Sequence, residues 1–105
     1  MDAATAHSRG TDIQIIDVRE NDEWAAGHIA GALHIPLAQL PQRLSELDPA
    51  RTSVTVCRAG GRSARAHALL AAAGRSAEDL TGGMQAWEAA GLPVSAPDGR
   101  PGLVI

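Results

Sequence analysis

The sequence predicts one α/β domain built around a mostly parallel sheet, and three observations lead to this prediction. Short β-branched or apolar runs alternate with helix-forming segments along the chain, as in repeated βαβ units. The run Ile13–Val18 has little polar interruption, which is typical of a strand covered on both faces. The length of 105 residues suits a single hydrophobic core.

The N-terminal segment is expected to supply a strand and a short helix. Residues 1–11 form either a short helix or a disordered lead before the strand Ile13–Val18. Asn21 can cap the helix that follows, and Gly27 suits the left-handed position just after its end. Trp24 is expected to turn from this helix into the core, because large aromatic side chains mostly serve burial.

The rest of the domain continues the alternation of strands and helices. Leucines at helical spacing predict a helix over Leu37–Leu47, in which Pro41 is acceptable where a new turn begins. The domain is expected to span residues 1–94, and residues 95–105 form a tail. The other predicted elements are the strands Leu33–Ile35, Ser53–Val56 and, weakly, Ser76–Leu80, and the helices Ser63–Ala73 and Met84–Ala90.

Composition limits the classes of function. The net charge of -3 argues against general nucleic-acid binding, which usually shows a basic footprint. A single cysteine excludes an internal disulfide and leaves any redox chemistry dependent on an external thiol. Neither a membrane-spanning run nor a secretory signal is recognisable, so we expect a cytoplasmic protein that does not act at a membrane.

The segment Val54–Ser63, with the sequence V-T-V-C-R-A-G-G-R-S, predicts a thiol held between a strand and a helix. Successive amides in such a loop can converge on one point, and the positive end of the helix dipole lies behind them. Together with nearby arginines, this environment lowers the pKa of a thiol from about 8.5 into the range of about 3.5 to 7.5. We expect Cys57 to be a nucleophile; the alternative is a buried, inert cysteine at the end of a core strand.

Two further residues are assigned supporting roles. Asp17 lies at the end of its strand, so it should share one rim of the sheet with Cys57, where ligands bind in such folds. Pairing of Asp17 with a nearby arginine is the favoured interpretation, ahead of a direct effect on Cys57. Arg19 is expected to form a local ion pair with Glu20 or Glu23.

Four segments in order resemble the rhodanese-like (sulfurtransferase) domain: I-I-D-V-R-E, G-H-I-A-G-A-L-H-I-P-L, C-R-A-G-G-R-S and L-T-G-G-M-Q-A-W. The resemblance implies a three-layer α/β/α domain with a sheet of four or five strands. It also implies a thiosulfate sulfurtransferase in which Cys57 takes a sulfane sulfur, becomes a persulfide and passes the sulfur to cyanide or a thiol. The loop residues expected to bind the substrate are Arg58, Ala59, Gly60, Gly61, Arg62 and Ser63.

Several alternatives accompany this interpretation. Four residues separate Cys57 from Arg62, whereas the related dual-specificity phosphatases have five, so a sulfur-sized ligand is favoured over a phosphoester. No metal or cofactor is expected, because His28 and His34 lack a recognised ligand spacing. A persulfide relay, or a redox or protein-binding module acting with a partner protein, is the alternative to an enzyme. The family's first edge strand is missing or reduced here, and Leu103–Ile105 is hypothesised to cover that edge.

Overall fold

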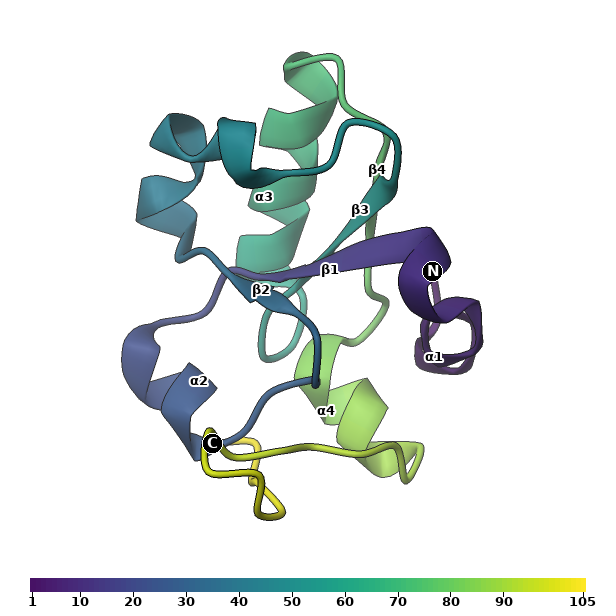
Figure 1. Ribbon diagram of the computed structural model, residues 1–105, viewed down its shortest axis with the longest axis vertical. Coiled ribbons are helices and arrows are strands. Elements are labelled where there is room, and N and C mark those ends of the chain that lie inside the picture. Colours follow the sequence, from purple (N-terminus) through teal and green to yellow (C-terminus); the bar gives the residue numbers. More distant parts are fainter.

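The computed structural model describes all 105 residues, and at its centre lies a fully parallel sheet of four strands in the order β2-β1-β3-β4 (Figure 1). The predicted α/β fold with a parallel sheet is therefore confirmed. The strands are β1 (Ile13–Asp17), β2 (Leu33–His34), β3 (Thr52–Val56) and β4 (Ala77–Asp79). The α-helices are α1 (Ala3–Arg9), α2 (Asn21–Ala26), α3 (Gly61–Ala72) and α4 (Gly83–Ala89).

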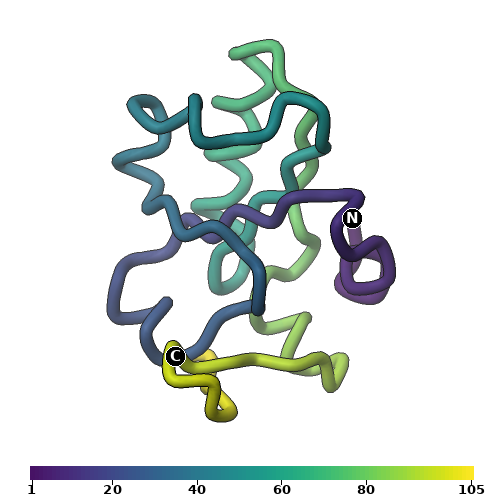
Figure 2. The backbone as a smooth tube through the Cα atoms, viewed as in Figure 1, coloured from purple at the N-terminus to yellow at the C-terminus, as the bar shows by residue number.

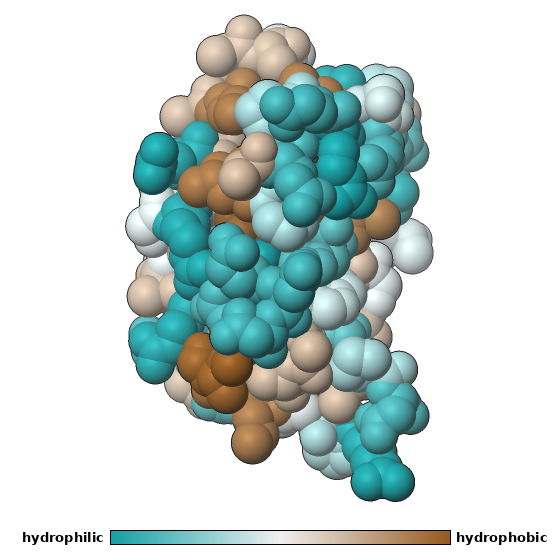
Figure 3. All heavy atoms as spheres, turned by 90° about the vertical axis from the view of Figure 1, so that its left-hand side faces the viewer, coloured by the Kyte–Doolittle hydropathy of each residue, from teal (hydrophilic) through white to brown (hydrophobic).

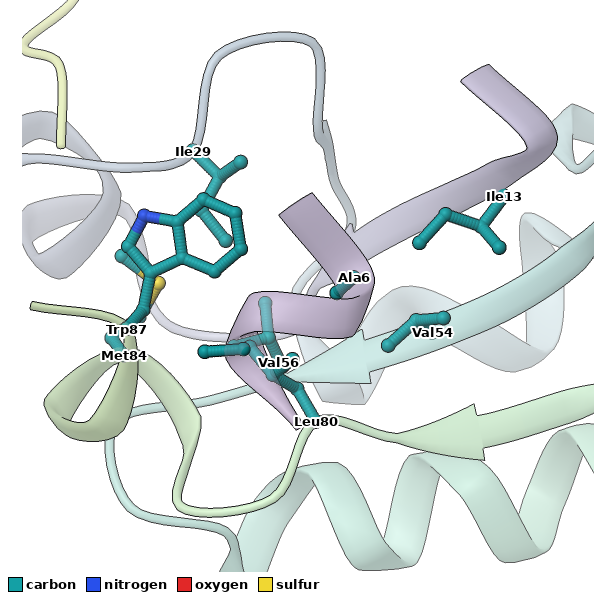
Figure 4. Packing of buried hydrophobic residues seen from close by; sticks show 9 residues of the cluster. Ala6, Ile13, Ile29, Val54, Val56, Leu80, Met84 and Trp87 are labelled. Atoms are coloured by element: carbon teal, nitrogen blue, oxygen red, sulfur yellow. The ribbon is translucent and has the colours of Figure 1, made fainter. Parts of the chain in front are cut away.

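Each face of the sheet carries its own hydrophobic layer, which makes the domain three layers deep. On one face, α1 and α4 pack over β3 through a cluster that contains Val56 and Trp87 (Figure 4). On the other face, α3 contributes Ala66 and Leu70 against β1, and Cys57 belongs to this second cluster. Both faces of β1 and β3 are buried, which explains why their sequences do not alternate between apolar and exposed polar residues.

The predicted helix over residues 37–47 is wrong. This segment forms two short 3-10 helices, η2 (Leu37–Gln42) and η3 (Leu44–Glu46). Pro41 lacks the amide that an α-helix would need, and tighter turns of i to i+3 bonds tolerate it better than a continuous α-helix. Leu40 is nevertheless fully buried against α3, so the leucine pattern correctly marked an apolar face.

The N-terminal segment adopts one of its two expected forms, whereas the C-terminal tail lies elsewhere than the sequence suggested. Of the alternatives for residues 1–11, the structure has the helix α1, which Asp2 caps through Thr5. The first residue of the chain extends the β4 edge, because the Met1 amino group donates to Asp79 O at 3.0 Å and Thr81 N donates to Met1 O at 2.9 Å. The N-terminus, not the C-terminal tail, therefore borders that edge of the sheet.

The C-terminal tail crosses the end of α2 and approaches α4 (Figure 2). Leu103 N donates to Ala26 O at 2.9 Å, and Val104 N donates to a carboxylate oxygen of Glu88 at 3.4 Å. The hypothesis that the tail covers an edge of the sheet is wrong, since these contacts are all made with helices and loops. Gly27 permits the crossing: a Cβ atom there would lie 2.6 Å from Leu103 N.

Helix α2 differs from its prediction in three details. Glu20, not Asn21, is the N-cap, and it forms a reciprocal capping box with Glu23. Gly27 has an extended φ of 168°, so close packing and not a left-handed conformation requires glycine there. Trp24 is half-buried between histidine rings and is absent from both core clusters, so its predicted core position is wrong.

Candidate active site

Cys57 directly follows β3, and the loop behind it turns its amides toward the sulfur. Gly60 N donates to Cys57 Sγ at 3.0 Å, and the hydroxyl oxygen of Ser63 lies 3.4 Å from the same sulfur. Gly60 has a φ of 134°, a conformation that side chains rarely adopt, and it immediately precedes α3. The thiol thus lies at the N-terminus of a 12-residue helix, as the sequence predicted.

The environment favours the thiolate form of Cys57. Burial of the sulfur raises the pKa of this thiol, but hydrogen bonds from the Ser63 hydroxyl and from the amides of Ser63, Gly60 and Ala59 together lower it by more. The net result is a pKa below the ordinary value for cysteine. Only 2% of the Cys57 residue is exposed, so the thiol lies in a buried position beneath the loop.

The N-terminus of α4 fixes the orientation of the cysteine loop. Met84 N donates to Cys57 O at 2.8 Å, and Gln85 N donates to Arg58 O at 3.0 Å. Because these two carbonyls point at α4, the peptide groups of the loop are prevented from turning over. Gly83 makes the approach possible: its φ is 58°, and a Cβ atom there would lie 2.8 Å from Arg58 O.

Arg62 is anchored to α2. Its Nη1 and Nη2 atoms donate to the two carboxylate oxygens of Glu23 at 2.6 and 2.8 Å. These hydrogen bonds from Arg62, opposed by burial, lower the pKa of Glu23, and the carboxylate in turn raises the pKa of Arg62. The family resemblance implies a substrate-binding role for Arg62, whereas this geometry supports a role as the anchor of the loop.

Arg58 is exposed, and no acidic side chain pairs with it. Its Nε donates to Ile105 O at 3.0 Å in the tail. In the amide orientation that satisfies both side chains, Gln85 Oε1 accepts from Arg58 Nη1 at 2.9 Å. Unlike Arg62, Arg58 therefore forms no ion pair with an Asp or Glu side chain.

Asp17 and Arg19 form a buried ion pair at the adjoining strand end. Arg19 Nη2 lies 2.7 Å from Asp17 Oδ2, and it also donates to Gly27 O at 2.8 Å. The sequence favoured pairing of Asp17 with a nearby arginine, and this geometry agrees with it. The predicted pairing of Arg19 with Glu20 or Glu23 is wrong, because the nearer and fully buried Asp17 takes the guanidinium.

The histidines considered as metal ligands stack on Trp24 instead. The centroids of the His28 and His34 rings lie 3.6 and 4.7 Å from that of Trp24, with interplanar angles of 4° and 8°. His28 Nδ1 lies 2.9 Å from Trp24 O, and His34 Nε2 lies 2.8 Å from Arg19 O. The third histidine of this part of the fold, His67, lies 3.1 Å from Ala77 O and takes no part in the cysteine loop.

A cavity on one face of the sheet does not include the cysteine loop. A space of about 540 Å³ lies on the sheet face that α1 and α4 leave open, and Ile15, Leu33 and Trp87 are among its lining residues. None of its lining residues comes from residues 57–63. The candidate reactive group, Cys57, therefore lies outside this cavity.

Two residues important to the site escaped the sequence interpretation. The sequence predicts Glu23 only as a possible partner of Arg19, whereas in the structure its carboxylate accepts both hydrogen bonds from Arg62. Gly83 was considered only as part of a helix start, although its lack of a side chain lets α4 bind the cysteine loop. The Gly82-Gly83 pair before a helix was the one available signal of such a close approach.

Comparison with known proteins agrees with this architecture. The chain matches the Rhodanese-like domain over residues 1–90. It is 40% identical over 89 residues to a sulfurtransferase of Allochromatium vinosum, which covers 84% of this chain and 83% of that protein. It is also 42% identical over 93 residues to the HTH-type transcriptional regulator Rv0324 of Mycobacterium tuberculosis, of which it spans only 41%.

The solved structures give the same result. The crystal structure of a rhodanese-related protein from Thermoplasma volcanium superposes with a TM-score of 0.85 at 32% identity, covering 90% of this chain and 94% of the other. The family match over residues 1–90 includes all four strands and the two helices beside the cysteine loop, α3 and α4. This chain belongs to the rhodanese-like domain family.

Proposed function

We propose that this protein is a sulfurtransferase that carries sulfane sulfur as a Cys57 persulfide. The supporting observation is the cradle of the thiol: Gly60 N lies 3.0 Å from Sγ at the N-terminus of α3, and the pKa of Cys57 is lowered. A thiolate is the form that attacks sulfur. The sulfurtransferase names of relatives such as those from Allochromatium vinosum and Bacillus subtilis support the same reaction class.

The proposed transfer has two balanced steps. In the first, Cys57–S⁻ attacks the outer sulfur of thiosulfate, the S–S bond of the donor breaks, and sulfite leaves with its electron pair, so that Cys57–S–S⁻ remains. In the second, cyanide or a thiolate attacks the outer sulfur, and Cys57–S⁻ leaves. The negative charge stays near the same amide donors throughout, so the loop stabilises both the free and the sulfur-loaded enzyme.

The loop residues have separate roles in this proposal. Gly60 N donates to the sulfur, and the Ser63 hydroxyl lies beside it, where it can donate once the thiol ionises. Arg62 anchors the loop through Glu23, and Arg58 is the cation available to an anionic donor. Ala59 contributes its amide. Gly61 places no side chain at the start of α3, where nothing lies within 4 Å of the position that a Cβ atom would take.

A persulfide relay to a partner protein is the second candidate. The observation that favours it is the 2% exposure of Cys57, together with the similarity to a putative sulfur carrier protein of Bacillus subtilis. The two candidates differ in kinetics. An enzyme turns over thiosulfate and cyanide freely, whereas a relay turns over slowly until its acceptor protein is added.

Intact mass spectrometry tests the shared intermediate. After incubation with thiosulfate, the protein should gain the mass of one sulfur atom, and cyanide should remove it. Cys57→Ser should show no gain. A wild-type protein that never gains sulfur from thiosulfate or from a thiol persulfide would refute the proposed function. No helix in the structure has the length and apolarity required to cross a membrane.

A further inference from the structure

The two arginines of the cysteine loop differ in how their charges are compensated. Arg62 forms a fork with Glu23, whose side chain is only 13% exposed. Glu23 is itself held in place, because Glu20 N donates to its Oε1 at 3.1 Å in the capping box. The carboxylate is thus fixed before any substrate arrives, and it neutralises Arg62 in the resting protein.

The remaining charges near the loop leave little attraction for a dianion. Arg58 donates to the backbone oxygen of the last residue, Ile105, and to Gln85, and no Asp or Glu side chain pairs with it. The guanidinium of Arg19 is balanced by Asp17 at 2.7 Å. In the cysteine loop, an anionic donor therefore meets Arg58, which no acidic side chain pairs, and the partial positive charge of the α3 N-terminus.

The charge of the sulfur donor decides how strongly the cations at the cysteine loop must stabilise the reaction. Attack on thiosulfate brings a dianion against the Cys57 thiolate and ends with a leaving sulfite dianion. Attack on a thiol persulfide, R–S–SH, gives Cys57–S–SH and R–S⁻: the new S–S bond forms as the old one breaks, and the leaving thiolate takes the electron pair. The second reaction concentrates much less negative charge at the loop, so it needs fewer cations.

We propose that Glu23 is a specificity-determining residue that, by neutralising Arg62, makes thiol persulfides better sulfur donors than thiosulfate. This inference rests on the proposed sulfurtransferase function and narrows its donor class. Glu23 does not touch the reacting sulfur atoms in this arrangement. It acts through Arg62, which would otherwise present a second free guanidinium to a dianionic donor.

The test compares donors in three proteins: wild type, Glu23→Gln and Asp22→Asn. Glutamine keeps the shape of Glu23 and can still accept the capping-box hydrogen bond, whereas it releases the charge of Arg62. Asp22→Asn removes the same charge from the neighbouring exposed position of α2, which has no ion pair. The measurement is kcat/KM for sulfur transfer to a thiol acceptor from thiosulfate and from glutathione persulfide.

The ratio of the two kcat/KM values, thiosulfate over persulfide, carries the result. In wild type it should lie below one. It should rise about tenfold in Glu23→Gln and less than about threefold in Asp22→Asn, and the rise should shrink in 1 M salt, where the Debye length is about 3 Å. Glu23→Asp keeps the charge but shortens the side chain, so its ratio should stay near that of wild type.

The outcomes separate this inference from the proposed function. An unchanged ratio in Glu23→Gln, or an equal rise in Asp22→Asn, would overturn the specificity role while leaving sulfur transfer intact. Equal ratios in Glu23→Asp and Glu23→Gln would make Glu23 a structural residue only. A wild-type protein that transfers sulfur from neither donor would overturn the function itself, and the inference with it.

Discussion

Ser63→Ala tests whether side-chain donation sets the ionisation of Cys57. Ser63 is fully buried, and its Oγ lies 3.4 Å from Cys57 Sγ and donates to Gly60 O at 3.2 Å. When the thiol ionises, this hydroxyl can turn its proton to the sulfur. Removing it deprives the thiolate of one donor, while the amide of Gly60 at 3.0 Å remains.

The size of the effect follows from that geometry. A hydrogen bond to a charged group contributes about 1.5–3 kcal/mol, and a shift of one pKa unit corresponds to about 1.4 kcal/mol. The contact is long and other donors remain, so the lower limit applies, and the pKa of Cys57 should rise by about one unit. Below its pKa, the thiolate fraction then falls about tenfold.

The assay is the rate of Cys57 alkylation by iodoacetamide as a function of pH. The midpoint of the rate profile should lie below the ordinary cysteine value of about 8.5 in wild type and should move up in Ser63→Ala. Ser53→Ala is the matched control, since Ser53 is a buried serine of β3 whose hydroxyl accepts from Gln14 and not from Cys57. A midpoint that stays in place in Ser63→Ala, or moves equally in both variants, would refute the reasoning.

Three further predictions concern the frame around the thiol. Gly83→Ala should lower the free energy of unfolding by about 3 kcal/mol and slow sulfur loading, because Gly83 has a φ of 58° and contacts the cysteine loop. Gly61→Ala is the control: open space surrounds Gly61, so denaturant titrations should show almost no change in stability. The hydrogen bonds from Arg62 lower the pKa of Glu23, so this ion pair stabilises the fold above the unfolded pKa of about 4.3, and the stabilisation is lost as pH falls through the folded pKa. Urea titrations should therefore show Glu23→Gln about 1 kcal/mol less stable than wild type at pH 7. This difference should shrink below about pH 4. Trp87→Ala should cost about 3–5 kcal/mol and Trp24→Ala about 1–2 kcal/mol, since Trp87 lies in the core and Trp24 stacks at the surface; equal thermal shifts would contradict this order.

The position of Trp24 on the surface around α2 is a feature that the sequence pattern did not predict. Figure 3 shows the side of the molecule that faces left in Figure 1, where hydrophilic residues form a broad area and apolar ones occur in separate groups. Trp24 reads as a core residue in the sequence because it is aromatic and lies on a short helix. Of its stacking partners, His28 lies only four residues further on, just beyond α2, whereas His34 comes from β2 and depends on the packing of the sheet.

The 3-10 helices show a different limit of sequence reasoning. Leucine spacing correctly marked Leu40 and Leu47 as buried, but the same spacing serves a helix and a series of tight turns. Pro41 decided between them, and its effect depends on whether the residues beside it can make alternative hydrogen bonds. Boundaries elsewhere shifted by only one or two residues, as for β3 and α3.

The amino-acid order alone determined the parallel α/β fold and the thiol between β3 and α3, because both depend on local signals: apolar strands, glycines and the residues that flank one cysteine. Only the tertiary structure decided which charges are free at that thiol. Glu23 stands 39 positions before Arg62, and Asp17 rather than Glu23 takes Arg19. Ion pairs depend on distances of a few ångströms between separate segments, and those distances exist only after the chain has packed.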